Sequence, residues 1–253
     1  MRRLLQAILN AVPAVFAKSG LRFVIPCAMA FLFSCKPYNY LPHAVNSGFY
    51  GNQGEVQLTG YASSAGISAM GGVAVTDNIS VNGLYAGNPG GSGYHDKEAE
   101  FSLGVNNGRK GHKMMYGICG GYGFGSNFKQ DSGALYKTFS GNFTRPFVVL
   151  SIGSVSQKSS GLRAEVSFSL RFNYLTYNGD QTSSKGVVSN FDAQHFYYEP
   201  YVRGNVGGKH LRFDYGAGLA LKNVREAGKG ARIFPVELNI GLTLLFGRKY
   251  DDE

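Results

Sequence analysis

Tryptophan is absent from this chain, and cysteine, proline and charged residues are all scarce. Its 253 residues include three Cys, eight Pro and only 16% Asp, Glu, Lys and Arg. Three scattered cysteines exclude a disulfide framework and a Cys-based zinc site, because both need paired or closely spaced ligands. A hydrophobic fraction of 43% excludes a disordered polar chain.

Glycine and aromatic residues are abundant instead. The chain has 36 Gly, 18 Phe and 16 Tyr. Glycine disfavours helix interiors, whereas Phe and Tyr favour strands, so the composition predicts an all-β protein. A length near 250 residues is compatible with one sandwich or barrel domain.

The formal net charge of +9 raises the question of nucleic-acid binding. Its distribution argues against that function, since Arg2, Arg3, Lys18 and Arg22 all lie at the N-terminus and no acidic residue precedes residue 35. The remaining chain has no dense basic stripe. We therefore expect no nucleic-acid partner.

Residues 1–34 have the pattern of an export signal, in which basic residues are followed by apolar runs. The runs 4–16 and 23–33 are both shorter than the roughly 20 residues of a transmembrane helix. Pro13 and Pro26 also interrupt them. This pattern predicts a signal peptide over 1–34 rather than a membrane-spanning helix.

The end of this leader, Leu32-Phe33-Ser34-Cys35, resembles the lipobox of bacterial lipoproteins. The resemblance implies that Cys35 is diacylated and becomes the mature N-terminus, followed by a lipid-anchored tether over 35–53. No acidic run follows Cys35, so we expect the anchor in the periplasmic leaflet. The alternative is that Cys35 is a buried small residue beyond an ordinary cleaved signal.

From residue 54 the sequence alternates between apolar and polar residues with period two, which is typical of strands with two different faces. The clearest segment is 162–174, where apolar residues occupy the even positions. The segments expected as strands are 55–62, 66–75, 79–87, 97–106, 114–124, 141–155, 162–174, 194–205, 210–222 and 234–246. Because about 9 to 11 residues cross a bilayer as a strand, these segments predict an antiparallel up-and-down transmembrane β-barrel of about ten strands over 54–253.

The connections between these segments differ in length and composition. Tight turns are expected near 76–78, 106–112, 157–161 and 207–209, and a short tip near 63–65. Polar stretches rich in Gly, Ser, Asn and Asp lie at 88–96, 125–140, 177–193 and 223–232. They predict long external loops opposite short periplasmic turns.

Periodicity alone does not distinguish a lipid-facing barrel from a soluble barrel with an apolar interior. The charges on the polar faces favour the lipid-facing barrel, since they can pair across a polar lumen. The residues of this expected lumen network are Arg163, Glu165, Arg171, Glu199, Arg203, Arg212, Asp214 and Glu237.

Two uses of such a lumen remain open. A barrel of about this size is narrow, so a paired network that fills it is one interpretation. A narrow anion-preferring pore through Arg163, Arg171, Arg203 and Arg212 is the other.

Aromatic residues near the strand ends would form interfacial girdles. These residues are Tyr116, Phe124, Tyr174, Phe196, Tyr198, Phe234 and Phe246. Packing in a core is the alternative role for them.

The last predicted strand resembles the C-terminal signal that the outer-membrane barrel assembly machinery reads. Its polar residue is Asn239, its glycine Gly241, and its apolar and aromatic positions Leu244 and Phe246. With the lipobox-like Cys35 and ten strand segments, the chain resembles the outer-membrane β-barrel lipoproteins common in Bacteroidota. The resemblance implies a location in the bacterial outer membrane, periplasmic termini, and the lipid bilayer and assembly machinery as partners.

Sequence motifs for catalysis and metal binding are largely missing. None of the five histidines has metal-ligand spacing, and no hydrolase motif occurs. The glycine clusters 87–93 and 120–125 do not open a helix, so phosphate binding is not expected. His195 is in phase with the lumen face and could form an acid/base site with Ser167 or Ser169. We expect that the chain binds no metal and no cofactor and that it is not an enzyme.

The function expected from these features is a structural or loop-mediated binding role. The loops 88–96, 125–140 and 177–193 would supply the surface for an extracellular ligand or partner, because loops on a rigid scaffold carry recognition. Alternatives are a periplasmic lipocalin-like lipoprotein that carries an apolar ligand, a narrow anion-preferring pore and a membrane-embedded lipid hydrolase.

Overall fold

The computed structural model describes residues 43–46, 49–88, 94–107, 114–130, 136–157, 162–222 and 236–247. All of them belong to one compact unit, residues 38–253. The predicted signal peptide and Cys35 lie outside the described residues. Within these ranges, no helix is long and apolar enough to cross a membrane.

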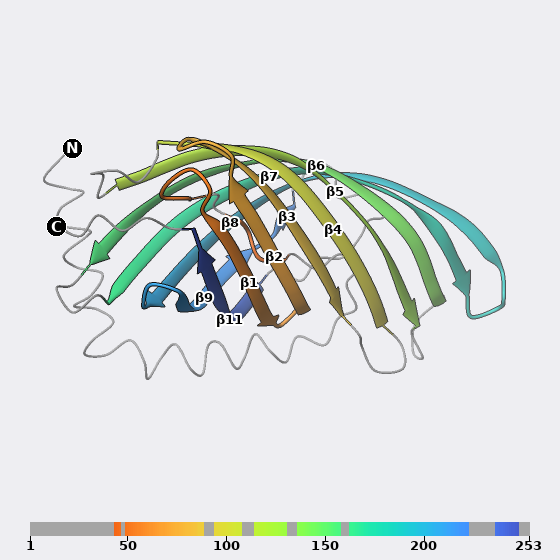
Figure 1. The fold of residues 1–253 in the computed structure, drawn as a ribbon. Helices are drawn as coiled ribbons and strands as arrows, with labels where there is room; N and C mark the ends of the chain where they lie inside the picture. The colour runs from red at the N-terminus through yellow and green to blue at the C-terminus, as the bar shows by residue number, and fades with distance from the viewer. Residues whose placement is uncertain are drawn as a thin grey trace, which may run out of the picture. The chain divides into compact units, whose positions relative to one another are not determined.

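The described elements are all strands (Figure 1). They are β1 (Val56–Ser63), β2 (Gly66–Ala74), β3 (Ile79–Asn88), β4 (Tyr94–Asn106), β5 (Met114–Gln130), β6 (Tyr136–Gln157), β7 (Arg163–Ser183), β8 (Val188–Gly207), β9 (Leu211–Leu219), β10 (Leu221–Lys222) and β11 (Val236–Phe246). Only Ala220 separates β9 from β10, and both pair with β8, so they act as one strand.

These strands form a closed, ten-stranded antiparallel barrel, which confirms the predicted all-β class, strand number and up-and-down topology. Strands adjacent in sequence pair with each other from β1 to β9, and β9 pairs with β11. The ring closes where β1 pairs with β11, with Val56 opposite Phe246. We call this end of the barrel the basal end and the opposite one the distal end.

Two of the predicted tight turns lie in the described residues, at 75–78 between β2 and β3 and at 208–210 between β8 and β9, and the structure confirms both. Most of the other two, 106–112 and 157–161, lies outside the described residues. At the first of these turns the Thr76 hydroxyl accepts hydrogen bonds from the backbone N–H groups of Asn78 and Ile79. This local bonding explains why the polar run after β2 reverses the chain.

The prediction of long distal loops at 125–140 and 177–193 is wrong for their described residues, whereas residues 89–93 of the loop expected at 88–96 lie outside the described residues. β5 continues to Gln130, β6 starts at Tyr136, and β7 and β8 leave only 184–187 between them. Polar residues continue these strands because ladder hydrogen bonds use the backbone, whatever the side chain. The fourth predicted loop, 223–232, lies outside the described residues.

The hairpin that joins β7 to β8 shows how a short turn replaces a long loop. The N–H of Ser183 donates to the Val187 carbonyl at 2.8 Å, and that of Gly186 donates to the Ser183 carbonyl at 2.9 Å. Gly186 has a φ of +79°, a conformation that glycine adopts without steric cost.

We name the distal parts of β5 to β8 the distal wall. It comprises 125–130, 136–142, 176–183 and 188–194. Figure 1 shows β5 to β8 running past the ends of the shorter strands β1 and β2. The described residues of the stretches 125–140 and 177–193, which were expected as loops, thus belong to the sheet.

The two faces of the barrel differ in chemistry. Large apolar side chains are exposed on the outward faces of β1 to β9 and β11, for example Phe101 at 64% and Leu103 at 65%. The opposite faces carry buried polar and charged side chains. The orientation expected from the sequence, with apolar residues outward and charges inward, is therefore the one observed.

Candidate functional site

The structure brings the predicted network of charges together inside the barrel. Arg171, Arg203, Arg212, Asp214, Glu165, Glu199 and Glu237 are all buried, and Arg163 lies nearest the basal rim with 12% of its side chain exposed. Each lies on the inner face because alternate residues of a strand share a face. The lumen charges form the first part of the candidate site.

Arg171 is the centre of the main cluster. Its Nε donates to Glu199 Oε2 at 2.6 Å, and its Nη1 donates to Glu100 Oε1 at 3.1 Å. The guanidinium carbon also lies 5.9 Å from the ring centroid of Phe147, within the range of a cation–π contact. This side chain thus links β4, β7 and β8 across the lumen.

Sequence reasoning missed a second arginine of this cluster. Arg145 is fully buried and forms ion pairs with Glu98 and Glu100. The two glutamates alternate with Ala99 and Phe101, so the period-two pattern of that segment could have placed them in the lumen. Arg145 follows an irregular stretch and precedes Pro146, where alternation gives little guidance.

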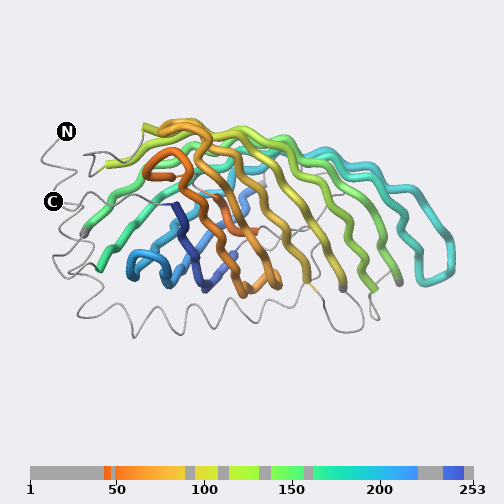
Figure 2. The backbone as a smooth tube through the Cα atoms, viewed as in Figure 1, coloured from red at the N-terminus to blue at the C-terminus, as the bar shows by residue number. Residues whose placement is uncertain are grey.

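The segment before β1 also lies inside the barrel, within the range expected as a tether. His43, Ala44 and Val45 are each at most 2% exposed. His43 Nε2 is 3.7 Å from carboxylate oxygens of both Asp96 and Glu98. Figure 2 shows residues 43–46 in red-orange among the strands. We name residues 43–46 and 49–53 the inner segment.

Specific hydrogen bonds hold the inner segment. Arg171 Nη2 donates to the His43 carbonyl at 3.2 Å, and the Tyr50 hydroxyl donates to Asn82 Oδ1 at 2.5 Å. Burial raises the pKa of Tyr50 above its usual value, which keeps this donor protonated. Gln57 Nε2 donates to the Phe49 carbonyl at 2.8 Å.

Glycines in the barrel wall make room for the inner segment. A Cβ on Gly153 would lie 3.0 Å from the Phe49 ring, and one on Gly72 would collide with the Tyr50 hydroxyl. The absence of side chains at these positions lets the two aromatic rings pack against the wall. The inner segment therefore fills space that the strands leave for it.

Two further groups of charges lie closer to β9 and β11. Arg203 Nε donates to Asp214 Oδ1 at 2.6 Å, and Thr243 donates to the other oxygen of that carboxylate. Toward the basal end, Arg212 Nη1 lies 2.5 Å from Glu165 Oε1, and Asn205 Nδ2 donates to Glu165 Oε2 at 3.2 Å. All four predicted pore arginines thus have carboxylate partners, since Arg163 Nε is 3.5 Å from Glu165 Oε1.

The residues of the predicted assembly signal fall on both faces of β11. Asn239 points inward and donates to the Tyr201 hydroxyl at 2.5 Å and to Glu237 Oε1 at 3.2 Å. Gly241 packs against β1, where a Cβ would collide with the Gly60 carbonyl. Leu244 and Phe246 are exposed on the outward face.

The structure does not bring the proposed acid/base residues together. Ser169 is opposite Tyr201 in the pairing of β7 with β8, whereas His195 is opposite Leu175. Six residues of strand separate the two levels, which is about 20 Å. Ser169 instead shares a 2.8 Å hydrogen bond with Ser151. An acid/base pair of His195 with Ser169 is therefore wrong, and Ser167 lies still nearer the basal end.

An aromatic cluster that the sequence did not indicate lies on the inner face of β6, β7 and β8, where the distal wall begins. Its buried members are Phe139, Phe143, Leu175, Tyr177, Ala193 and Tyr197. The Tyr177 hydroxyl donates to Asn127, and its ring lies 5.1 Å from that of Phe139 between centroids. These residues occupy inward-facing positions in the same alternation as the charged residues of the lumen, but they are mostly apolar.

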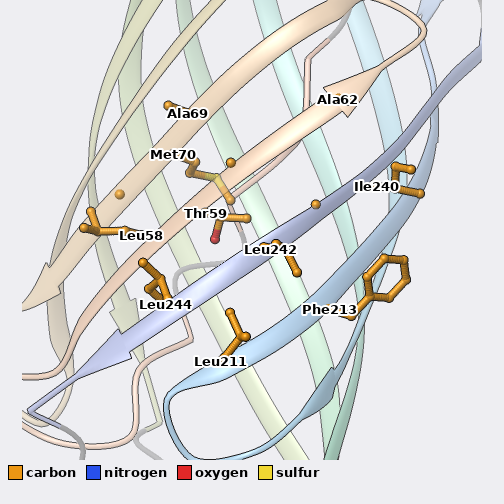
Figure 3. A pocket seen from close by; sticks show the side chains of 13 residues that line it. Leu58, Thr59, Ala62, Ala69, Met70, Leu211, Phe213, Ile240, Leu242 and Leu244 are labelled. Atoms are coloured by element: carbon orange, nitrogen blue, oxygen red, sulfur yellow. The ribbon is translucent and has the colours of Figure 1, made fainter.

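The outward face has a broad apolar depression where the barrel closes. It has a volume of about 920 Å³ and lies over β2, β1, β11 and β9 (Figure 3). Large side chains such as Leu58, Phe213 and Leu242 surround small residues such as Gly60 and Ala69. Contrast in side-chain size therefore shapes the depression.

Among the residues of the described ranges, no group of three or more His, Cys, Asp or Glu side chains could hold a metal ion. Cys119 is a buried free thiol on the inner face. No protein-family model matches this chain, and no curated protein matches it.

Proposed function

We propose that the chain is an integral β-barrel protein of a bacterial outer membrane, with a closed lumen and a structural or binding role. The observation that carries the proposal is the continuous apolar surface on the outward faces of a closed barrel. Soluble proteins rarely expose contiguous apolar patches larger than a few hundred Å². Lipid would solvate such a surface.

The height of this apolar surface suits a bilayer. On β7 the outward residues run from Ala164 to Tyr174 without a charge. Ten residue steps of about 3.4 Å, tilted by about 40°, give a band about 25 Å tall, the height typical of outer-membrane barrels. Tyr116, Phe124, Tyr174, Tyr198 and Phe246 of the expected girdles are exposed on this face, and Phe196 is half-buried. Phe234 lies outside the described residues.

The interior supports the same proposal. Charged groups pair inside the ring, and the strand backbones bond to neighbours all the way round, as a barrel in lipid requires. A lipocalin-like carrier would turn its apolar faces inward, whereas these strands turn them outward.

The remaining parts of the proposal come from the sequence. A signal peptide over 1–34 would direct export, lipidation of Cys35 would anchor the mature N-terminus, and Asn239 to Phe246 would engage the assembly machinery. The first residue of β1, Val56, and the last residue of β11, Phe246, both lie at the basal end of the barrel. We assign the basal end to the periplasm, as the resemblance to outer-membrane lipoproteins implies.

A binding role fits the geometry better than conduction. The inner segment and the paired arginines occupy the lumen, so an anion path lacks unpaired cations at the predicted positions. The distal wall offers a polar sheet beyond the apolar band. We propose that this wall, rather than long loops, carries recognition.

Replacing Leu170 by Arg tests the lipid-facing orientation. Leu170 is half-buried at mid-strand on the outward face of β7. A lipid-facing Arg near the midplane costs about 2 to 4 kcal/mol, so we expect L170R to reduce assembly into the outer membrane. The measurement is the amount of folded protein in the outer-membrane fraction.

The matched control is Asn178→Arg, on the same face of the same strand beyond the apolar band. Its cost should be about 0 to 1 kcal/mol, and it should assemble normally. Normal assembly of L170R would overturn the proposed orientation.

A further inference from the structure

Two grooves adjoin each other on the outward face of the barrel, where the distal wall meets the apolar band. They share Lys97, Ser126 and Asn142 in their linings. We propose that together they bind one membrane glycolipid, with a phosphorylated sugar headgroup in the distal groove and an acyl chain in the apolar one. This inference rests on the proposed location in a membrane.

The register of the sheet aligns polar side chains between the two grooves. Lys97 of β4 is opposite Ser126 of β5, which is opposite Asn142 of β6, which is opposite Asn178 of β7. These residues form one row across four strands. A row that offers an ammonium, a hydroxyl and two amides can donate to and accept from a polyhydroxylated group.

The distal groove has a volume of about 340 Å³ and contains a second row of side chains on the distal side of the first. Its lining adds His95, Ser140 and Asp180 on the outward faces. His95 stacks against Phe128 with ring centroids 6.4 Å apart, which gives the groove an aromatic edge. Asp180 can accept hydrogen bonds from sugar hydroxyls at the end away from Lys97.

The second groove lies on the basal side of the row and has a volume of about 420 Å³. Tyr85, Ala99 and Phe124 line it, and the small Ala99 is directly opposite Phe124 in the pairing of β4 with β5. These apolar side chains belong to the outward band proposed to face lipid. An acyl chain that descends from a headgroup in the distal groove would enter this groove.

The charges and dimensions select the headgroup. Among the described residues, Lys97 is the one lysine or arginine that lines either groove, so one phosphate is expected at its end. The row crosses three inter-strand spacings, about 14 Å, which is longer than a simple phosphodiester headgroup needs. Two linked sugars with one phosphate match the row better than ethanolamine or glycerol.

Binding of defined lipids to the folded full chain in detergent micelles tests this inference. The probes are a synthetic acylated glucosamine disaccharide with one phosphate, phosphatidylethanolamine and phosphatidylglycerol, all with acyl chains of equal length. Native mass spectrometry would report how much of each lipid stays bound. We expect the disaccharide lipid to bind at least about tenfold more tightly than the other two.

Two variants address the two grooves separately. Lys97→Ala should weaken disaccharide-lipid binding about tenfold, and Ala99→Phe should weaken it by filling the apolar groove with a side chain that lipid still tolerates. Lys185→Ala is the matched control, since Lys185 is exposed on the distal side and lines neither groove. It should bind as the unaltered chain does.

Gel mobility before and after boiling separates the two proposals. If the chain is a heat-modifiable membrane barrel but binds all three lipids equally, or if both groove variants bind normally, the glycolipid site is wrong and the membrane barrel stands. If the chain is recovered as a soluble protein without detergent, the proposed function fails and the site fails with it.

Discussion

At the scale of the residue, individual buried ion pairs stabilise the interior of the barrel. Arg171 contacts Glu199, Glu100 and the His43 carbonyl while only 1% of its side chain is exposed. Removing one partner of a buried ion pair leaves an uncompensated charge, which costs more than the pair contributes. The arginines that fill the lumen are therefore structural in the first place.

Replacing Arg171 by Met tests this role. The variant keeps the apolar stem but removes one of the two arginines, Arg171 and Arg145, that Glu100 and Glu199 share, so we expect a loss of about 3 to 5 kcal/mol in the free energy of unfolding. A urea titration in which the folded fraction is read from the intensity of the unboiled gel band measures this free energy. Arg163→Met is the control at the basal rim, and its loss should be about 1 kcal/mol or less. Equal losses for the two variants would contradict the special role of Arg171.

Period-two reasoning identified the lumen residues wherever alternation is clean. It placed Glu165, Arg171 and Arg212 correctly because each has apolar neighbours on both sides in sequence. It missed Arg145, which lies in an irregular stretch. It also missed His43, because nothing in local periodicity shows that a segment outside the sheet folds back into the barrel.

The inner segment is the element that most changes the interpretation of the lumen. Ala44 and Val45 share one buried apolar cluster with Cys119 and Phe147 of the wall. Residues 43–45 and 49–50 of the expected tether are thus part of the core. Because the inner segment covers Cys119, the reactivity of that thiol reports whether the segment is in place.

Val45→Asp should expel the inner segment, since a carboxylate in an apolar cluster is costly to bury. We then expect faster maleimide labelling of Cys119, which is 5% exposed in the folded barrel. Mass spectrometry of the peptide that contains Cys119 measures the rate. Val187→Asp, at an exposed turn, should leave the rate unchanged. A folded V45D variant with unchanged labelling would contradict the packing of this segment.

The distal wall depends on close approach between β6 and β7. Gly141 is directly opposite Gly179, and a Cβ on Gly179 would lie 2.7 Å from the Gly141 Cα. Gly179→Val should therefore separate the two strands and make 176–194 sensitive to protease, while the barrel below remains heat-modifiable. Ser189→Val, exposed on β8, is the control and should remain resistant. Resistance of G179V would show that the wall does not need this contact.

Strand positions could be predicted from sequence far better than strand ends. The expected segment 79–87 matches β3 to within a residue, whereas the expected 162–174 is only the basal half of β7. Polar residues beyond Tyr174 pair through their backbones with β6 and β8, and side-chain hydropathy does not record that pairing. The grooves on the distal wall were missed for the same reason, because they depend on register across several strands.

At the scale of the whole barrel, the arrangement is the reverse of that in a soluble protein. Exposed apolar side chains cover the outside, and charged side chains pair inside. Closure through β1 and β11 makes this possible, since each strand of the ring then bonds to a neighbour on both sides within the apolar band. Composition and alternation together predicted this arrangement because both faces of each strand are visible in the sequence.

The most direct test of the membrane-barrel proposal is the gel mobility of the full chain from the outer-membrane fraction, compared before and after boiling. A closed membrane barrel resists detergent unfolding until it is heated. We predict that the protein is found in this fraction and that boiling shifts its mobility. A protein that is absent from the outer membrane, or whose mobility is the same with and without boiling, would contradict the proposal.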